Sequence, residues 1–211
     1  MDPSPVSHPA GRNPASAAPE PDEAALIKRS QDGDLAAFDP LVLRHQQEVF
    51  AVAMRMLGDR DEAQDVAQDA FVRAFRAIGT FRGQSKLSTW LVSITMNLCR
   101  NRRRWWARRR RVIAVSLDDP IETEEGTLAH EVADPSPSPA SAAEHRERQQ
   151  QLSEALQMLS EGERSIVVLR DLQGYSYEEM ADMLGCRVGT VKSRLSRARL
   201  RLRAMLDGAL S

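Results

Sequence analysis

The side chains with the clearest chemistry in this sequence are the basic ones of residues 189–203, GTVKSRLSRARLRLR. If the segment is a helix, at roughly 100° per residue, its apolar residues form one stripe. That stripe comprises Val191, Leu195, Ala198, Leu202 and Met205. The opposite face carries Lys192, Ser193, Ser196 and Arg197, with Arg194, Arg199 and Arg201 on its flanks. Because no Asp or Glu lies between Arg187 and Leu206, this face has a single sign of charge and suits an anionic partner.

Two serine–glutamate pairs upstream predict the elements that hold this helix. Ser160 and Glu163, and then Ser176 and Glu179, have the spacing of capping boxes, and Gly185 ends the second short helix. Two helices joined by a tight turn form a helix-turn-helix, whose second helix enters the major groove of DNA. There Arg and Lys read guanine, Ser reads several bases, and flanking arginines hold phosphates. We therefore expect DNA contacts from one set of residues: Lys192, Ser193, Arg194, Ser196, Arg197 and Arg199. A solvated face on a helical bundle is the alternative interpretation.

A second basic segment, residues 100–111 (RNRRRWWARRRR), combines eight arginines with Trp105 and Trp106. Exposed tryptophan is costly unless its ring stacks on something, and bases, arginine planes or a protein groove would all serve. We expect this segment to lie near nucleic acid. A purely structural, solvated helix end is the alternative.

Acidic residues gather in the segment GDRDEAQDVAQDAF, residues 58–71. Asp59 and Asp61 fit the start of a helix, where the macrodipole favours acids. Asp65 and Asp69 lie deeper, one helical turn apart and near Gln68. They indicate an exposed acidic face for a basic partner.

Several kinds of chemistry have no residues to support them. The two cysteines, Cys99 and Cys186, are far apart and belong to no Cys/His cluster, so each reads as a small buried side chain. The sequence has no paired His, no GxSxG, no phosphate-binding Gly loop and no carboxylate pair placed for acid–base catalysis. We expect no enzyme activity, catalytic residue, metal, cofactor or small-molecule substrate. No apolar run reaches membrane-span length and no signal peptide is evident, so a cytoplasmic protein is expected.

The pattern predicts an all-α protein of two small helical domains joined by a flexible linker. Residues 1–21 hold six of the eleven prolines and form a disordered tail, and the acidic, Pro-Ser-rich residues 112–143 form the linker. The first domain, 22–111, has a helix capped by Asp34 or Asp39 that bends or restarts at Pro40 and is ended by Gly58. Further helices are expected from Asp59 to about residue 78 and from about residue 87 to 104. The second domain is 144–211, with its first capped helix ending near residue 174.

Four stretches resemble conserved regions 2 and 4 of one family, the extracytoplasmic-function group of bacterial RNA polymerase sigma factors. They are DLAAFDPLV, AQDVAQDAFVRAF, TFRGQSKLSTWLVSITMN and LQGYSYEEMADMLGCRVGTVKSRLSRAR, in the family's order. Within the family the chain is most similar to the envelope-stress members.

The resemblance implies a role for each surface. Asp65, Gln68 and Asp69 would bind the clamp helices of core RNA polymerase. A pocket for a base flipped from the promoter's -10 element would involve Ala77, Phe81, Val92, Ile94 and Asn97, with residues 79–86 as its lid. The helix-turn-helix residues named above would read the -35 element. Val92 stands where the envelope-stress members carry Tyr, and Ser196 where they carry Phe, so base preferences do not carry over at those positions.

The resemblance also implies control by an anti-sigma factor, which would cover the DNA-binding and polymerase-binding faces and could hold the chain at the inner membrane. The linker would thread toward the RNA exit path. Two other classes remain open on the residues alone. A dimeric helix-turn-helix regulator leaves the acidic helix and the Trp-Arg segment unexplained, and a site-specific recombinase would need a catalytic domain with a βα pattern.

Overall fold

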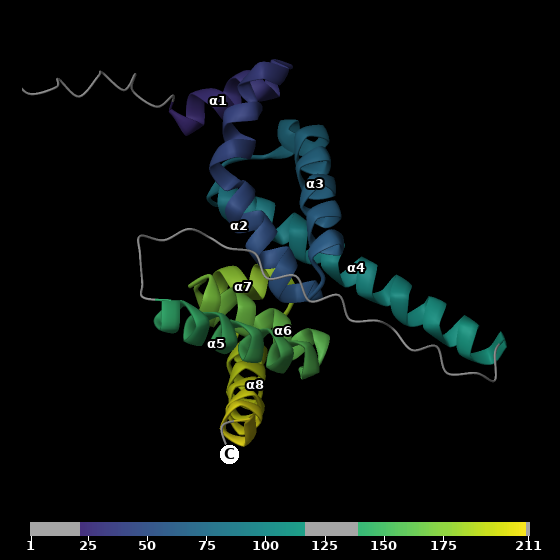
Figure 1. Cartoon of the computed structure of the whole chain (residues 1–211). Coiled ribbons are helices and arrows are strands. Elements are labelled where there is room, and N and C mark those ends of the chain that lie inside the picture. Colours follow the sequence, from purple (N-terminus) through teal and green to yellow (C-terminus); the bar gives the residue numbers. More distant parts are fainter. Residues whose placement is uncertain (1–21, 117–138, 210–211) are drawn as a thin grey trace, which may run out of the picture.

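The computed structural model describes residues 22–116 and 139–209, and every regular element in these two ranges is helical (Figure 1). The all-α prediction is therefore confirmed for the described residues. The predicted N-terminal tail, 1–21, and residues 117–138 of the predicted linker lie outside them.

The first domain packs three helices, α2 (Asp39–Leu57), α3 (Arg60–Ala77) and α4 (Leu87–Ser116), around one core. A short helix α1 (Glu23–Gln31) and the 3₁₀ turns η1 (Leu35–Ala37) and η2 (Ile78–Thr80) complete it. The α3 side of the core is built from alanines and valine at helical spacing, namely Ala63, Val66, Ala70 and Ala74, each at most 2% exposed. Small side chains let α3 approach α2 and α4 closely, which leaves its acidic positions on the outer side.

The predicted helix ends are largely confirmed. Gly58 ends α2 in a left-handed conformation, φ 78°, and the Asp59 carboxylate accepts from the Glu62 backbone N–H at 2.8 Å to start α3. The chain does restart near Pro40, but Asp39 is not the cap: it is the first residue of α2, and Phe38 precedes it without a capping side chain. The Asp34 carboxylate instead caps η1, accepting from Ala37 N–H at 3.3 Å. Proline is tolerated there because the first turn needs no donor from it.

The second domain consists of α5 (Pro139–Met158), α6 (Glu161–Val167), the π turn η3 (Val168–Leu172), α7 (Tyr177–Leu184) and α8 (Val188–Ala209). Both predicted capping boxes are formed, at Ser160 with Glu163 and at Ser176 with Glu179. Gly185 ends α7 with φ 61°. The helices α7 and α8 therefore form the predicted helix-turn-helix.

Helices extend further than the sequence pattern indicated. The helix α4 runs to Ser116 instead of about residue 104, and α5 begins at Pro139, so both continue into the range 112–143 assigned to the linker. Arginine and alanine are good helix formers, which favours continuation where no glycine or proline intervenes. Figure 1 shows the C-terminal half of α4 projecting past α3.

The two domains touch where α2 and α5 end. Arg164 on α6 is 0% exposed and donates to Met56 O at 2.7 Å, across the domain boundary, and to Leu156 O at 2.6 Å. The Gln157 amide donates to Arg55 O at 3.3 Å. Near the middle of α2, the Tyr175 hydroxyl donates to Glu48 Oε1 at 3.1 Å. Nothing in the sequence pattern predicted this contact.

Candidate nucleic-acid and polymerase interfaces

The helix α8 has the two faces that its sequence predicted. Val191, Leu195 and Ala198 are buried, at 0%, 2% and 0% exposed, against α6 and α7, while Leu202 and Met205 are half-buried. All of the side chains predicted to contact DNA are exposed: Lys192, Ser193, Arg194, Ser196, Arg197 and Arg199. The helix-turn-helix therefore presents a basic face to solvent.

Contacts within the domain separate these residues into two groups. Arg199 forms two hydrogen bonds with the Asp171 carboxylate on η3, and the bond to Asp171 is the largest cause that raises the pKa of Arg199. Arg201 donates to Glu163 at 3.1 Å. These flank arginines are thus oriented by acids from other elements, which the local absence of acids did not reveal. No salt bridge among the described residues involves Lys192, Arg194 or Arg197.

The exposed face of α8 is ordered by its own backbone. The Arg197 Nε donates to Ser193 O at 3.3 Å, and the Ser193 hydroxyl donates to Thr190 O at 3.1 Å. The Lys192 ammonium lies 5.3 Å from the centre of the Tyr177 ring on α7. A cation–π contact of this kind limits the conformations of the long lysine side chain before any ligand arrives.

The acidic face predicted for polymerase lies on α3. Asp65, Gln68 and Asp69 are all exposed there. Arg102 on α4 reaches across to this face and pairs with Glu62 and, at 3.1 Å, with Asp65. The hydrogen bond with Glu62 is the largest cause that raises the pKa of Arg102. A basic partner would therefore meet Gln68 and Asp69 directly and Asp65 in competition with Arg102.

The residues predicted to hold a flipped base come from the end of α3, from Phe81 after η2, and from α4, and the helices α3 and α4 pack together. Ala77, Phe81 and Ile94 are half-buried and Asn97 is exposed. Phe81 packs on Trp90 with ring centres 5.3 Å apart. Val92 needs a correction: it is 0% exposed and belongs to the buried core, so its side chain is not open to contact with a base. A residue two positions before Ile94 points to the other side of a helix, which explains its burial.

The loop that follows α3 is held by α1, an element with no role in the sequence analysis. The Gln31 amide donates to Ile78 O at 3.1 Å and to Phe81 O at 2.8 Å. These two bonds fix the backbone on both sides of residues 79 and 80. Residues 82–86 of the predicted lid are exposed.

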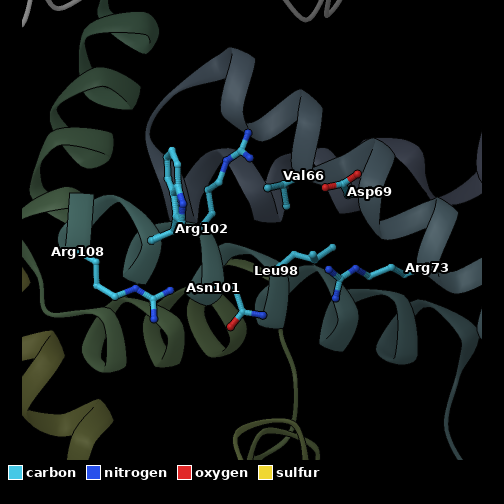
Figure 2. Close-up of a pocket in the computed structure, with 8 residues that line it drawn as sticks. Val66, Asp69, Arg73, Leu98, Asn101, Arg102 and Arg108 are labelled. Carbon is cyan, nitrogen blue, oxygen red and sulfur yellow. The ribbon is translucent and has the colours of Figure 1, made fainter. Parts of the chain in front are cut away.

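The Trp-Arg segment forms one wall of a cavity between α3 and α4, of about 350 Å³. Figure 2 shows side chains that line it, and the full set is Val66, Asp69, Arg73, Leu98, Asn101, Arg102, Trp105 and Arg108. Trp105 and Trp106 meet edge to face, with ring centres 4.8 Å apart, and the Arg109 guanidinium carbon lies 5.2 Å from the Trp105 ring centre. The predicted stacking partner thus includes an arginine plane. Sequence reasoning missed Arg73, although it lies one turn beyond Asp69 on the face that Asp65 and Asp69 share.

No helix in the described ranges is both long and apolar enough to cross a membrane. In the same ranges, no group of three or more His, Cys, Asp or Glu side chains is placed to hold a metal ion.

Comparison with known protein families matches both domains. Residues 41–111 match the family described as Sigma-70 region 2, and residues 149–202 match Sigma-70, region 4. The RNA polymerase sigma-H factor of Pseudomonas aeruginosa is 40% identical over 174 residues, which cover 82% of this chain and 88% of that protein. The ECF RNA polymerase sigma-E factor of Escherichia coli K12 is 37% identical over 174 residues, with the same coverage of 82% and 88%.

Solved structures agree with the sequence relatives. The sigma factor RpoE of Bartonella quintana, in complex with the anti-sigma factor NepR, matches with a TM-score of 0.60 at 30% identity, over 81% of this chain and 96% of that one. CnrH, in complex with the cytosolic domain of CnrY, matches with a TM-score of 0.59 at 27% identity, over 88% of this chain and 97% of that one. The chain belongs to the extracytoplasmic-function group of bacterial RNA polymerase sigma factors.

Proposed function

We propose that this sigma factor directs core RNA polymerase to its promoters by dividing promoter recognition between its two helical domains. The observation that carries the proposal is the exposed basic face of α8 in a helix-turn-helix with both capping boxes formed. Lys192, Ser193, Ser196 and Arg197 read base edges in the -35 element, and Arg194 and Arg199 hold phosphates. The Asp171 carboxylate keeps Arg199 on the flank of the helix, where a phosphate contact is the suitable role.

The first domain binds polymerase and opens the -10 element. Asp65, Gln68 and Asp69 form its docking face, supported by their exposure on one side of α3. A base extruded from the duplex enters the space near Ala77, Phe81, Ile94 and Asn97, and half-buried aromatic and apolar side chains return part of the stacking energy that extrusion costs. Asn97 is the residue of this pocket that recognises the base, because it is exposed and can both donate and accept hydrogen bonds.

The sigma factor itself is not an enzyme in this proposal, because bond formation belongs to polymerase. It acts in the cytoplasm and is controlled by an anti-sigma factor. Support for that partner comes from the complex of RpoE with the anti-sigma factor NepR. A membrane-bound anti-sigma factor would keep the chain at the inner membrane until release.

Run-off transcription from a randomised promoter library, with and without bacterial core polymerase, tests the proposal. Transcripts are expected only with both components, from templates that share -35 and -10 elements at a fixed spacing. Arg197→Ala is expected to relax the -35 sequence preference, at a cost of about 1–3 kcal/mol in promoter binding. Arg203→Ala is the matched control, because Arg203 is an exposed arginine farther along α8 that pairs with Asp207. Binding of a palindrome by the protein alone, without transcription, would instead identify a dimeric regulator.

The docking face has its own test. In pull-down of core polymerase without DNA, the double variant Asp65→Arg/Asp69→Arg is expected to lose binding, because the two new arginines would repel a basic partner. Asp182→Arg, which reverses an exposed acid on α7, is the control and should bind normally. Unchanged binding by the double variant would show that this face of α3 is not part of the polymerase interface.

A further inference from the structure

The proposed base pocket has one wall whose backbone is held by an element outside the pocket. Phe81 forms this wall, and its ring packs on Trp90. The side-chain amide nitrogen of Gln31, the last residue of α1, donates to both Ile78 O and Phe81 O. An amide nitrogen has two hydrogens, so both of its donors are used on this one turn of the chain.

The helix α1 is itself firmly attached to the first domain. Leu26 and Ser30 are each 3% exposed and face the core. At the other end of the helix, Glu23 Oε2 lies 3.0 Å from the Nε2 of His45 on α2, and His45 is 9% exposed. These contacts fix where α1 lies, so Gln31 offers its two donors from a set position.

The turn between α3 and α4 is also closed by hydrogen bonds of its own. The Phe81 N–H donates to Ile78 O at 3.0 Å, and the Thr80 hydroxyl donates to Ala77 O at 2.7 Å. These bonds shape the turn, but they join residues of the same short segment and cannot by themselves fix it relative to the rest of the domain. The amide of Gln31 supplies that link, because it joins the turn to residues 47 and 50 positions away.

We propose that Gln31 is a positioning residue for base capture. It acts through Phe81, whose ring it holds where an extruded base meets it, so that the wall is in place before DNA arrives. Preorganisation of this kind matters because ordering a loop at the moment of binding reduces affinity. This inference rests on the proposed function and extends it to α1, which has no role in the sequence analysis.

Binding of the holoenzyme to promoters with a premelted -10 element tests the inference. The captured base is first located with the unmodified protein, as the -10 position where an abasic site weakens binding most. Gln31→Leu, reconstituted with core polymerase, is expected to bind the intact promoter about tenfold more weakly, which is within what the loss of two hydrogen bonds can supply. It should bind the promoter that lacks the captured base as tightly as the unmodified protein does, because the wall then has nothing to hold.

The ratio of the two affinities separates positioning from stability. A variant that folds poorly has fewer active molecules, which lowers binding to both promoters in the same proportion and leaves the ratio unchanged. Gln31→Glu is a second variant with the same shape, but an ionised carboxylate only accepts hydrogen bonds, so its ratio should fall as well. Figure 1 shows α1 at the end of the first domain that lies away from the second, so these changes leave the contact between the domains in place.

Ser30→Ala is the matched control. Ser30 is the neighbour of Gln31 on α1, and its hydroxyl donates to Leu26 O at 2.8 Å within that helix. Its removal therefore deletes a buried hydrogen bond of α1 without touching the turn. The ratio of affinities for the intact and abasic promoters should equal that of the unmodified protein.

Three results would overturn the inference, and they are distinguishable. If Gln31→Leu keeps both affinities of the unmodified protein, the amide does not position the wall. If it weakens binding to both promoters by the same factor, α1 supports the domain as a whole and not the pocket. If the unmodified holoenzyme transcribes from the promoter but no abasic site in the -10 element weakens its binding, base capture itself fails, and the inference fails with that part of the proposed function.

Discussion

Removal of the Arg164 side chain should destabilise this structure, because its guanidinium group joins the ends of two helices. Its guanidinium has five N–H donors, and all are used, toward Met56 O, Leu156 O, Gln157 O, Leu159 O and Gln157 Oε1. Two of the helices end at these acceptors, α2 at Leu57 and α5 at Met158, so one buried cation satisfies carbonyls at two helix C-termini. Arg164→Met keeps an unbranched side chain and removes every donor.

The loss of stability in Arg164→Met depends on which of these acceptors keep another hydrogen-bond donor. Met56 O and Gln157 Oε1 still accept from Arg103, and Leu156 O still accepts from the Leu159 N–H. Gln157 O and Leu159 O lose the bond to Arg164 and gain nothing. A buried acceptor left without a partner costs about 1–3 kcal/mol, so the two together predict about 2–6 kcal/mol of lost stability. The lower half of this range is expected, because methionine avoids the cost of burying a charge.

Equilibrium unfolding of the full chain in urea, followed by circular dichroism, measures this loss. Arg170→Met is the matched control, since Arg170 donates one backbone hydrogen bond, to Tyr175 O at 2.7 Å, and lies 4.7 Å from the Tyr177 ring centre. It should cost about 1 kcal/mol. The midpoint of Arg164→Met should fall well below that of Arg170→Met. Equal midpoints with equal slopes would refute the assignment of Arg164 as a cap for two helices.

Four further predictions concern three side chains, Cys99, Ser176 and Tyr175. Burial raises the pKa of the Cys99 thiol to about 12, from an ordinary 9.0, so iodoacetamide should modify Cys186 in the native protein and leave Cys99 unmodified. Because the folded-state pKa is the higher one, this thiol's contribution to stability is complete below pH 9.0 and is lost as the pH rises toward about 12, which urea midpoints across that range would detect. Ser176→Ala removes the capping box of α7 and should cost about 1 kcal/mol in urea unfolding, with Ser176→Thr close to unchanged. Tyr175→Phe removes the hydrogen bond to Glu48 and should lower the unfolding free energy by about 1.5 kcal/mol, whereas Tyr177→Phe, which keeps its ring contacts with Arg170 and Lys192, should change it little.

Local patterns predicted the secondary structure of the second domain well. Capping boxes at Ser160 and Ser176 and the left-handed Gly185 depend on residues within a few positions of each other, so the sequence contains all the information they need. The apolar stripe of α8 was predictable for the same reason. The prediction for the first capped helix was wrong in one respect, because the chain forms a π turn at η3 and does not continue as a regular α-helix.

The same distinction between local and long-range information applies to the site residues. Exposure of Lys192, Ser196 and Arg197 follows from helical periodicity, and the structure agrees. The burial of Val92 does not follow from its motif, because which side of α4 faces the core depends on where α2 and α3 lie. The ion pairs of Arg102 with Glu62 and of Arg199 with Asp171 join residues 40 and 28 positions apart, and no local pattern signals them.

The sequence by itself determined most of the helices, the capping boxes, the helix-turn-helix and the division of charge between an acidic helix and two basic segments. These properties depend on neighbours within one or two turns, where helix geometry relates residues by simple spacing. Only the tertiary structure decided that Arg164 joins α2 to α5, that Arg102 lies across the acidic face, and that Arg73 and Arg108 line one groove with Trp105. Those contacts bring together residues from separate helices, and their positions are set by how buried faces pack, which spacing along one helix does not encode.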